Sequence, residues 1–364
     1  MVALLLALLL FIPALPGQAA PISRQDLGRK ALSAVAAQLK SDDSDLRARA
    51  AEILGATGNK AAIPMLKNLL NDRDKYVRIA AARSLWELGS TAGIKTIYAI
   101  INDVPAQGTV PVTNSPLVEL KVISQNKIRT KAMETLVGMK GKDASDVLYK
   151  MKNDNYGTIR DAAARELARL GNEEELVQFT DALGSGDEAL RYESAVVMSK
   201  LCVSAAADSL KALLPAEKSV RVLMAALDAL KCNPAKKEAL DEVLKLADNP
   251  NPTIKYKAVA VLSGIKDLKA QARLASVASS PASDIRLKIT AQKGLMYNGA
   301  PAAIAVVQSA LDAVNPEVKL EALDVVEGFT EDEAVPLLAQ ALDDVSVQVK
   351  LASALQVLKR FARK

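Results

Sequence analysis

The chain contains no histidine, which removes most of the acid–base chemistry that one side chain can perform near neutral pH. Without histidine there is no Ser-His or Cys-His nucleophile pair and no imidazole ligand for a metal. The two cysteines, Cys202 and Cys232, are too few for a tetrathiolate zinc site. No glycine-rich phosphate loop is present, and the acidic residues form no spaced cluster beyond helix caps and surface pairs. We therefore expect no catalytic site, no cofactor and no metal.

The residues that recur at a regular spacing are basic, and each follows an apolar residue early in an Ala-rich stretch. They are Arg47, Arg78, Arg129, Arg160, Arg191, Arg221, Lys255, Arg286, Lys319 and Lys350. Their separations are 31, 51, 31, 31, 30, 34, 31, 33 and 31 residues. A ladder of this kind could bind a polyanion. We favour a structural role, in which each basic residue pairs with acidic loop residues and helix termini and so joins consecutive repeats.

The positions around each basic residue predict an amphipathic helix. A small residue stands three positions later in eight of the ten cases, with Met224 and Ile289 as exceptions, and an apolar residue usually stands seven positions later. Asp, Asn or Ser is common four positions earlier, where a helix N-cap is expected. A shorter apolar helix precedes each of these helices. Two antiparallel helices per repeat, neither able to bury its apolar face alone, predict an all-α solenoid, or superhelix, of about ten repeats.

One repeat carries a recognisable motif, Asp-x-x-Val-Arg-x-x-Ala-Ala-x-x-Leu-x-x-x-Gly. Its residues are Asp74, Val77, Arg78, Ala81, Ala82, Leu85 and Gly89. The motif resembles HEAT repeats, and in particular the short bacterial variety called phycobilisome-lyase-like. The resemblance extends from about residue 26 to residue 360 and implies the solenoid fold and the structural role of the arginines. The His/Glu di-iron centre of HEAT-fold hydroxylases is excluded because the chain has no histidine.

The N-terminus has the pattern of a secretory signal peptide. Residues 1–15 carry no charge, residues 3–12 are all apolar, and this run is too short for a membrane-spanning helix. We expect cleavage after Ala19, a single solenoid domain over residues 20–364, and export to the periplasm or the extracellular space. No later segment is apolar enough to span a membrane. The net charge of +5 is modest, and the basic and acidic residues are interspersed, as is typical of a solvated helical surface.

The 51-residue gap in the series contains about 20 extra residues in repeat three, between residues 103 and 126. Pro105, Pro111 and Pro116 argue against a helix, and residues 117–123 partly alternate between apolar and polar. We therefore predict an extended loop or a small β-hairpin that projects from one edge of the solenoid. Such an insertion can be functional or neutral.

Two further features leave alternatives open. Trp86, the only tryptophan, either anchors a partner or fills space against the next repeat. Cys202 and Cys232 stand eleven residues after Arg191 and Arg221 and are therefore expected to be neighbours. They form either a disulfide, which export would favour, or two separate thiols, which the usual spacing of packed helices of about 8–10 Å would favour.

Fold and missing chemistry together predict a scaffold that binds a protein or peptide. The partner is expected along the concave surface of the second helices, at the repeat-three insertion, or at both. The candidate residues are Arg49, Glu52, Arg83, Lys131, Glu134 and Arg165 on the second helices, Val118 and Leu120 in the insertion, and nearby Trp86. Nucleic-acid or polyanion binding is the alternative, which interspersed acidic residues and few aromatics disfavour. A lyase-like enzyme is a third possibility.

Overall fold

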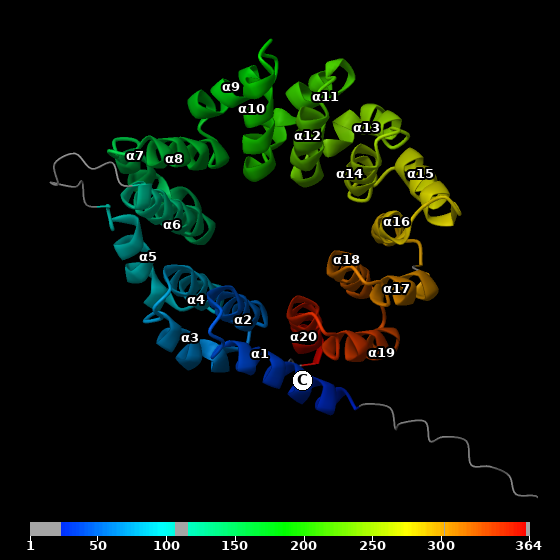
Figure 1. Ribbon diagram of the computed structural model, residues 1–364, viewed down its shortest axis with the longest axis horizontal. Coiled ribbons are helices and arrows are strands. Elements are labelled where there is room, and N and C mark those ends of the chain that lie inside the picture. The colour runs from blue at the N-terminus through cyan, green and yellow to red at the C-terminus, as the bar shows by residue number, and fades with distance from the viewer. Residues whose placement is uncertain (1–22, 106–115, 302, 362–364) are drawn as a thin grey trace, which may run out of the picture.

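The computed structural model describes residues 23–105, 116–301 and 303–361 of the chain. Within these residues every regular element is helical, and the α-helices form ten consecutive pairs. The first helix of each pair lies on the outside of the molecule and the second on the inside (Figure 1). The predicted all-α solenoid of ten two-helix repeats is confirmed.

The bounds of the helices follow the repeat. The outer helices are α1 (Arg24–Gln38), α3 (Ile63–Leu69), α5 (Ile94–Ile101), α7 (Ser145–Met151), α9 (Glu173–Ala182), α11 (Ala207–Ala216), α13 (Leu240–Leu246), α15 (Leu268–Ser279), α17 (Ile304–Leu311) and α19 (Glu331–Leu342). The inner helices are α2 (Ser44–Ala56), α4 (Lys75–Glu87), α6 (Pro116–Lys140), α8 (Gly157–Arg169), α10 (Glu188–Leu201), α12 (Val220–Cys232), α14 (Pro252–Leu262), α16 (Ile285–Tyr297), α18 (Pro316–Val326) and α20 (Val347–Phe361). One-turn 3-10 helices at Lys60–Ala62, Thr91–Gly93, Gly141–Ala144, Ser204–Ala206 and Lys236–Ala239 precede five of the outer helices.

The solenoid closes into a ring, which the sequence pattern did not lead us to expect. The repeats turn through a full circle, so that α20 lies beside α1 and α2 (Figure 1). Leu27, Ala31 and Val35 of α1 are fully buried. They belong to one apolar cluster that also contains residues of α2, α18 and α20. The two ends of the chain therefore share a continuous core.

Charged side chains flank this seam between the ends. Arg24 of α1 pairs with Glu331 at 2.6 Å and with Asp332 at 2.7 Å, both at the start of α19. Lys30 pairs with Asp343 at 2.6 Å, just after α19. The partners are largely exposed, so each pair contributes at most about 1 kcal/mol. Apolar burial is therefore the main source of stability at the seam.

The repeated basic residue joins consecutive repeats at four positions. The pairs are Arg47–Asp72 at 2.9 Å, Arg129–Asp154 at 2.5 Å, Arg191–Glu217 at 2.7 Å and Lys319–Asp344 at 2.5 Å. In each pair the acid lies in the loop before the next inner helix, and both partners are largely buried. The structural role predicted for the basic residues is confirmed at these four repeats.

The four acidic partners all have a pKa below the usual range. Hydrogen bonds from Arg47 and Arg191 lower the pKa of Asp72 and Glu217, respectively. Burial acts in the opposite direction on Asp154 and Asp344, but hydrogen bonds from Arg129 or Lys319 and from backbone amides outweigh it. All four carboxylates are therefore stabilised in their charged form by folding.

In repeats six and eight the predicted register is wrong by two residues. The repeat's basic position is occupied by Leu223 in repeat six and by Lys288 in repeat eight, in place of Arg221 and Arg286. Counted from these residues, the buried positions of α12 and α16 match those of α4 counted from Arg78. The N-cap residues Ser219 and Asp284 then lie four positions earlier, as in other repeats. The small residue three positions later becomes Ala226 or Ala291, both fully buried, in place of Met224 and Ile289. Met224 and Ile289, the two exceptions to the small residue at this position, were therefore the sign of the shifted register.

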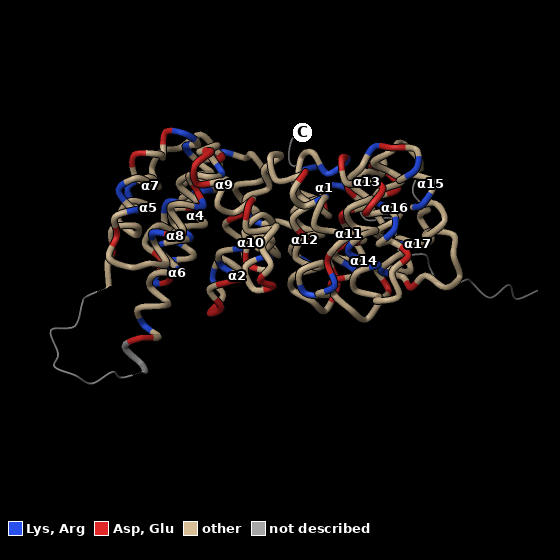
Figure 2. The backbone as a smooth tube through the Cα atoms, turned by 90° about the horizontal axis from the view of Figure 1, so that it is seen from above, with Lys and Arg blue, Asp and Glu red and all other residues tan. Residues whose placement is uncertain are grey.

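The expected extended loop or β-hairpin over residues 103–126 is also wrong in part. Residues 106–115 lie outside the described residues, but from Pro116 onward the segment is helical and forms the first turns of α6. Proline is tolerated at the first position of a helix. Extending an existing helix costs little, whereas a lone two-stranded hairpin is only marginally stable. Figure 2 shows these first turns projecting beyond the other helices on one face of the ring.

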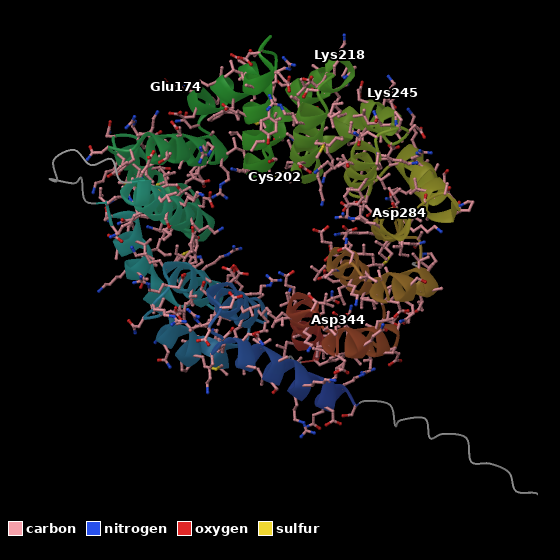
Figure 3. All side chains as sticks on the ribbon, in the orientation of Figure 1. Glu174, Cys202, Lys218, Lys245, Asp284 and Asp344 are labelled. Atoms are coloured by element: carbon pink, nitrogen blue, oxygen red, sulfur yellow. A yellow bond between two sulfur atoms is a disulfide. The ribbon has the colours of Figure 1, made fainter. Side chains whose placement is uncertain are left out.

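Cys202 and Cys232 form a disulfide, with their Cα atoms 5.2 Å apart. The two residues stand at the ends of α10 and α12, where the chain leaves the packed helices. Cys202 has a positive φ of 54° and turns away from the helical path. The usual spacing between helix axes therefore does not apply here, and the bond links repeats five and six beside the central opening (Figure 3).

Replacing Arg129 by methionine should destabilise the fold by about 3–5 kcal/mol, because Asp154 would be left buried without its counter-charge. The measurement is the free energy of unfolding from denaturant titration. Arg160→Met is the matched control, because Arg160 holds the same position one repeat later but is exposed and bonds only the carbonyl of Asp154. Equal destabilisation by both substitutions would contradict the role of the buried pair.

The melting temperature should fall as the pH is lowered through about 4, the usual pKa of unfolded carboxyl groups. Since the four acidic partners have lowered pKa values in the folded protein, the unfolded chain binds their protons more readily. Their contribution is complete above pH 5 and is lost at lower pH. The measurement is thermal unfolding between pH 6 and pH 2.5. Asp154→Asn should show a shallower fall, and an unchanged melting temperature down to pH 3 would refute the interpretation.

The double substitution of Leu27 and Ala31 by aspartate should open the ring, because it places charges in the apolar seam. We expect a larger radius of gyration in small-angle X-ray scattering, with the helical content nearly unchanged. Leu32→Asp is the control, since Leu32 lies on the same helix but is 48% exposed. A compact double variant would show that the repeats hold the ring shape without α1.

Candidate functional site

The predicted partner-binding residues of the second helices lie on the inner wall of the ring. In the first four repeats, the position five residues after the basic residue stands opposite the buried stripe of the inner helix, and in repeats one and three the position two residues after it does so as well. Arg49 and Glu52 occupy these positions in α2, Arg83 in α4, and Lys131 in α6. Glu134 follows in α6 and Arg165 in α8. The structure therefore brings together six residues that are far apart in the sequence.

Three adjoining hollows lie along this wall. The largest, of about 640 Å³ between α4, α6 and α8, is lined in part by Lys131, Glu134 and Arg165. A second, of about 290 Å³, lies between α2, α4 and α6 and is lined by Arg49, Glu52 and Arg83 among others. A third, of about 440 Å³, reaches from α4 to α10. Lys131 lines all three, so they form one connected surface, which we call the inner groove.

The charges of the inner groove are paired within single helices. Arg49 lies 3.1 Å from Glu52, Arg83 lies 3.0 Å from Glu87, and Lys131 lies 3.7 Å from Glu134. All six side chains are more than a third exposed, so each pair is worth about 0.3–0.5 kcal/mol. A partner could therefore exchange these contacts for its own at little cost.

The opposite wall of the ring is built differently. There the ion pairs bridge neighbouring inner helices: Lys257–Asp228 at 2.5 Å, Lys293–Asp324 at 2.6 Å and Arg286–Glu321 at 2.9 Å. Glu321 also accepts a hydrogen bond of 2.6 Å from Tyr256, and burial together with this bond raises the pKa of Tyr256 to about 12. Arg286 stacks 4.3 Å from the centre of the Tyr256 ring. These contacts join repeats six to nine and pair the charges of this wall across neighbouring helices.

Two aromatic residues, Tyr76 and Tyr156, line the inner groove, and neither was predicted from the sequence. Tyr76 lines both the first and the second hollow and is 38% exposed. Burial against the wall, followed by the charge of Asp74, raises the pKa of the Tyr76 hydroxyl, so it remains a neutral donor at physiological pH. Its position near the start of α4, opposite the apolar stripe, is the signal that could have identified it.

The other predicted residues lie outside the inner groove. Trp86 is half-buried and packs against the apolar cluster of repeats two to four, as the packing alternative expects. Leu120 is 60% exposed on the projecting part of α6, and the side chain of Val118 lies outside the described residues. Nearby Glu119, Val122 and Ile123 form one end of the largest hollow. The beginning of α6 therefore borders the groove.

Glu166 has the chemically most unusual carboxyl group near the groove. It lines the third hollow and is only 8% exposed, and burial raises its pKa despite the neighbouring Arg169. Arg169 bonds both Glu166 and the backbone carbonyl of Glu134. These contacts tie α8 to α6. In the described ranges no group of three or more His, Cys, Asp or Glu residues could hold a metal ion.

Two further hollows lie elsewhere on the ring. One of about 590 Å³ separates the outer helices α9 and α11. Another of about 480 Å³ lies at the carboxyl ends of α14, α16 and α18. Neither adjoins the inner groove. Among the helices that the structure describes, none is long and apolar enough to cross a membrane.

Comparison with known proteins supports the repeat and little else. Residues 32–108 match the family model of HEAT repeats. No curated protein matches the chain. Solved structures that resemble it include the complex of CpcE and CpcF of phycocyanin lyase from Nostoc, with 21% identity over 65% of this chain and 98% of that one and a TM-score of 0.37.

Two other solved structures are less similar in sequence. The karyopherin Kap121p is 16% identical over 92% of this chain, which spans only 42% of it, with a TM-score of 0.34. Human deoxyhypusine hydroxylase is 15% identical over 84% of this chain and 96% of that one, with a TM-score of 0.30. At these values the likenesses carry no argument about function. The family match identifies residues 32–108 as HEAT repeats, and the same two-helix unit recurs in all ten repeats that the structure describes.

Proposed function

We propose that this protein is an exported scaffold that binds a protein or peptide partner in the inner groove and performs no catalysis. The observation that carries the proposal is the continuity of three hollows across five repeats, from α2 to α10, with Tyr76 and Lys131 where they meet. Repeat proteins use concave surfaces of this kind to contact a partner over several repeats. Export rests on the apolar segment at the N-terminus, and the disulfide suits an oxidising compartment.

The composition of the groove favours a polypeptide as the partner. It presents both signs of charge next to a half-exposed tyrosine and to apolar atoms of Val122 and Ile123. Tyrosine and arginine are the residues that most often carry binding energy at protein interfaces. A polyanion would instead require an excess of positive charge along the wall.

The charge-reversing double variant Arg83→Glu, Lys131→Glu should weaken peptide binding at least tenfold, or by about 1.4 kcal/mol. The probes are 15-residue peptides selected from a random display library against the intact protein, and their affinity is measured by fluorescence anisotropy. Both side chains are more than half exposed, so the melting temperature should change by only a few degrees.

The matched control is Lys218→Glu, Lys245→Glu, which reverses two exposed charges on the outer rim, as Figure 3 shows. This variant should bind the selected peptides like the wild type. Equal loss of affinity in both variants, or selection of no peptide at all, would refute the proposal. Retention of a single-stranded polynucleotide that falls steeply with salt would instead support the nucleic-acid alternative.

A further inference from the structure

The inner wall of the ring is continuous. Each inner helix contacts the next from α2 through α20, and α20 contacts α2. The groove therefore does not open sideways, as it would in an open solenoid. Everything that reaches its hollows must enter the central opening from one of the two faces of the ring (Figures 1 and 2).

Helix packing sets the width of that opening. Neighbouring packed helices lie about 8–10 Å apart, so ten inner helices form a circle of axes roughly 25–32 Å across. Helices with side chains are about 10–12 Å thick, which leaves a clear opening of roughly 15–20 Å. This width admits an extended chain or one helix. A folded domain of about 100 residues has a radius of gyration of about 13 Å, so its diameter is larger than the width of the opening.

The charges on the wall indicate what such a segment should carry. Five residues after the basic position, the first four repeats present Glu52, Arg83, Glu134 and Arg165, so the sign alternates from one repeat to the next. Arg165 makes no ion pair with any other residue in the described part of the chain. An alternating wall is complementary to a segment that itself carries both charges.

We propose that the ring encloses one polypeptide segment of mixed charge, helical or extended, that passes through the central opening and contacts the inner groove. The inference rests on the proposed function and adds the form of the partner and its route of entry. The segment enters by a free end, because α20 contacts both α1 and α2 and leaves no gap in the inner wall.

A selected peptide tests the proposal when its ends are blocked in different ways. One probe carries a folded domain of about 100 residues at one end, and the other carries such a domain at both ends, each joined by a long flexible linker. A protease site lies beside one of the two domains. The association rate constant of each probe with the intact protein is measured by stopped-flow fluorescence.

The probe with one free end should bind like the bare peptide, and the doubly blocked probe should associate at least tenfold more slowly. Cleavage of one domain should restore the rate without any change to the ring. The ring-opened variant Leu27→Asp, Ala31→Asp should accept the doubly blocked probe directly, whereas Leu32→Asp should exclude it like the wild type. Equal rates for both probes on the wild-type ring would overturn threading. That result leaves the proposed function intact, because binding in the inner groove is tested separately. It would be refuted if peptide affinity did not depend on Arg83 and Lys131.

Discussion

The burial of α1 against α20 is the contact on which the form of the molecule depends. An open stack of repeats exposes an apolar surface at each end and usually needs polar capping repeats to stay soluble. In this chain the two terminal surfaces cover each other, and the fully buried Leu27, Ala31 and Val35 of α1 meet Val349 and Val357 of α20 in one cluster. Closure also fixes the repeat number, since one repeat fewer of the same geometry would leave a gap and one more would collide.

The ion pairs of the ring fall into two classes, buried pairs that stabilise it and exposed pairs that are available to a partner. The buried pairs, such as Arg129–Asp154, link an inner helix to the loop before the next inner helix and are costly to break, so they fix the rotation from one repeat to the next. Small errors in that rotation would add up over ten repeats and prevent closure. The exposed pairs of the inner groove, such as Lys131–Glu134, contribute little to stability and remain available for contacts with a partner.

Much of the fold could be predicted from the sequence because the repeat signal is local. The N-caps, the apolar stripe and the basic residue each depend on a few neighbouring positions, and they gave the correct repeat number and the correct inner helices. The register of repeats six and eight failed because Arg221 and Arg286 match the motif by chance, while Leu223 at the true position is not basic. Ring closure depends on the sum of small rotations, which no single repeat encodes. The apolar face that the terminal helix α1 presents, with Leu27, Ala31 and Val35, was its one local sign.

The two halves of the inner wall use the same repeat positions in opposite ways. In repeats one and three, the residues two and five positions after the basic residue pair with each other on one helix, as Arg49 does with Glu52. In repeats six to nine, the residues at these positions reach across to the next helix, as Lys257 does to Asp228. Bridging pairs commit both charged partners to each other across neighbouring inner helices, whereas pairs within a helix leave the facing side of the next helix free to contact a partner. The start of α6, which is longer than the other inner helices, extends the largest hollow around Tyr76 toward one face of the ring.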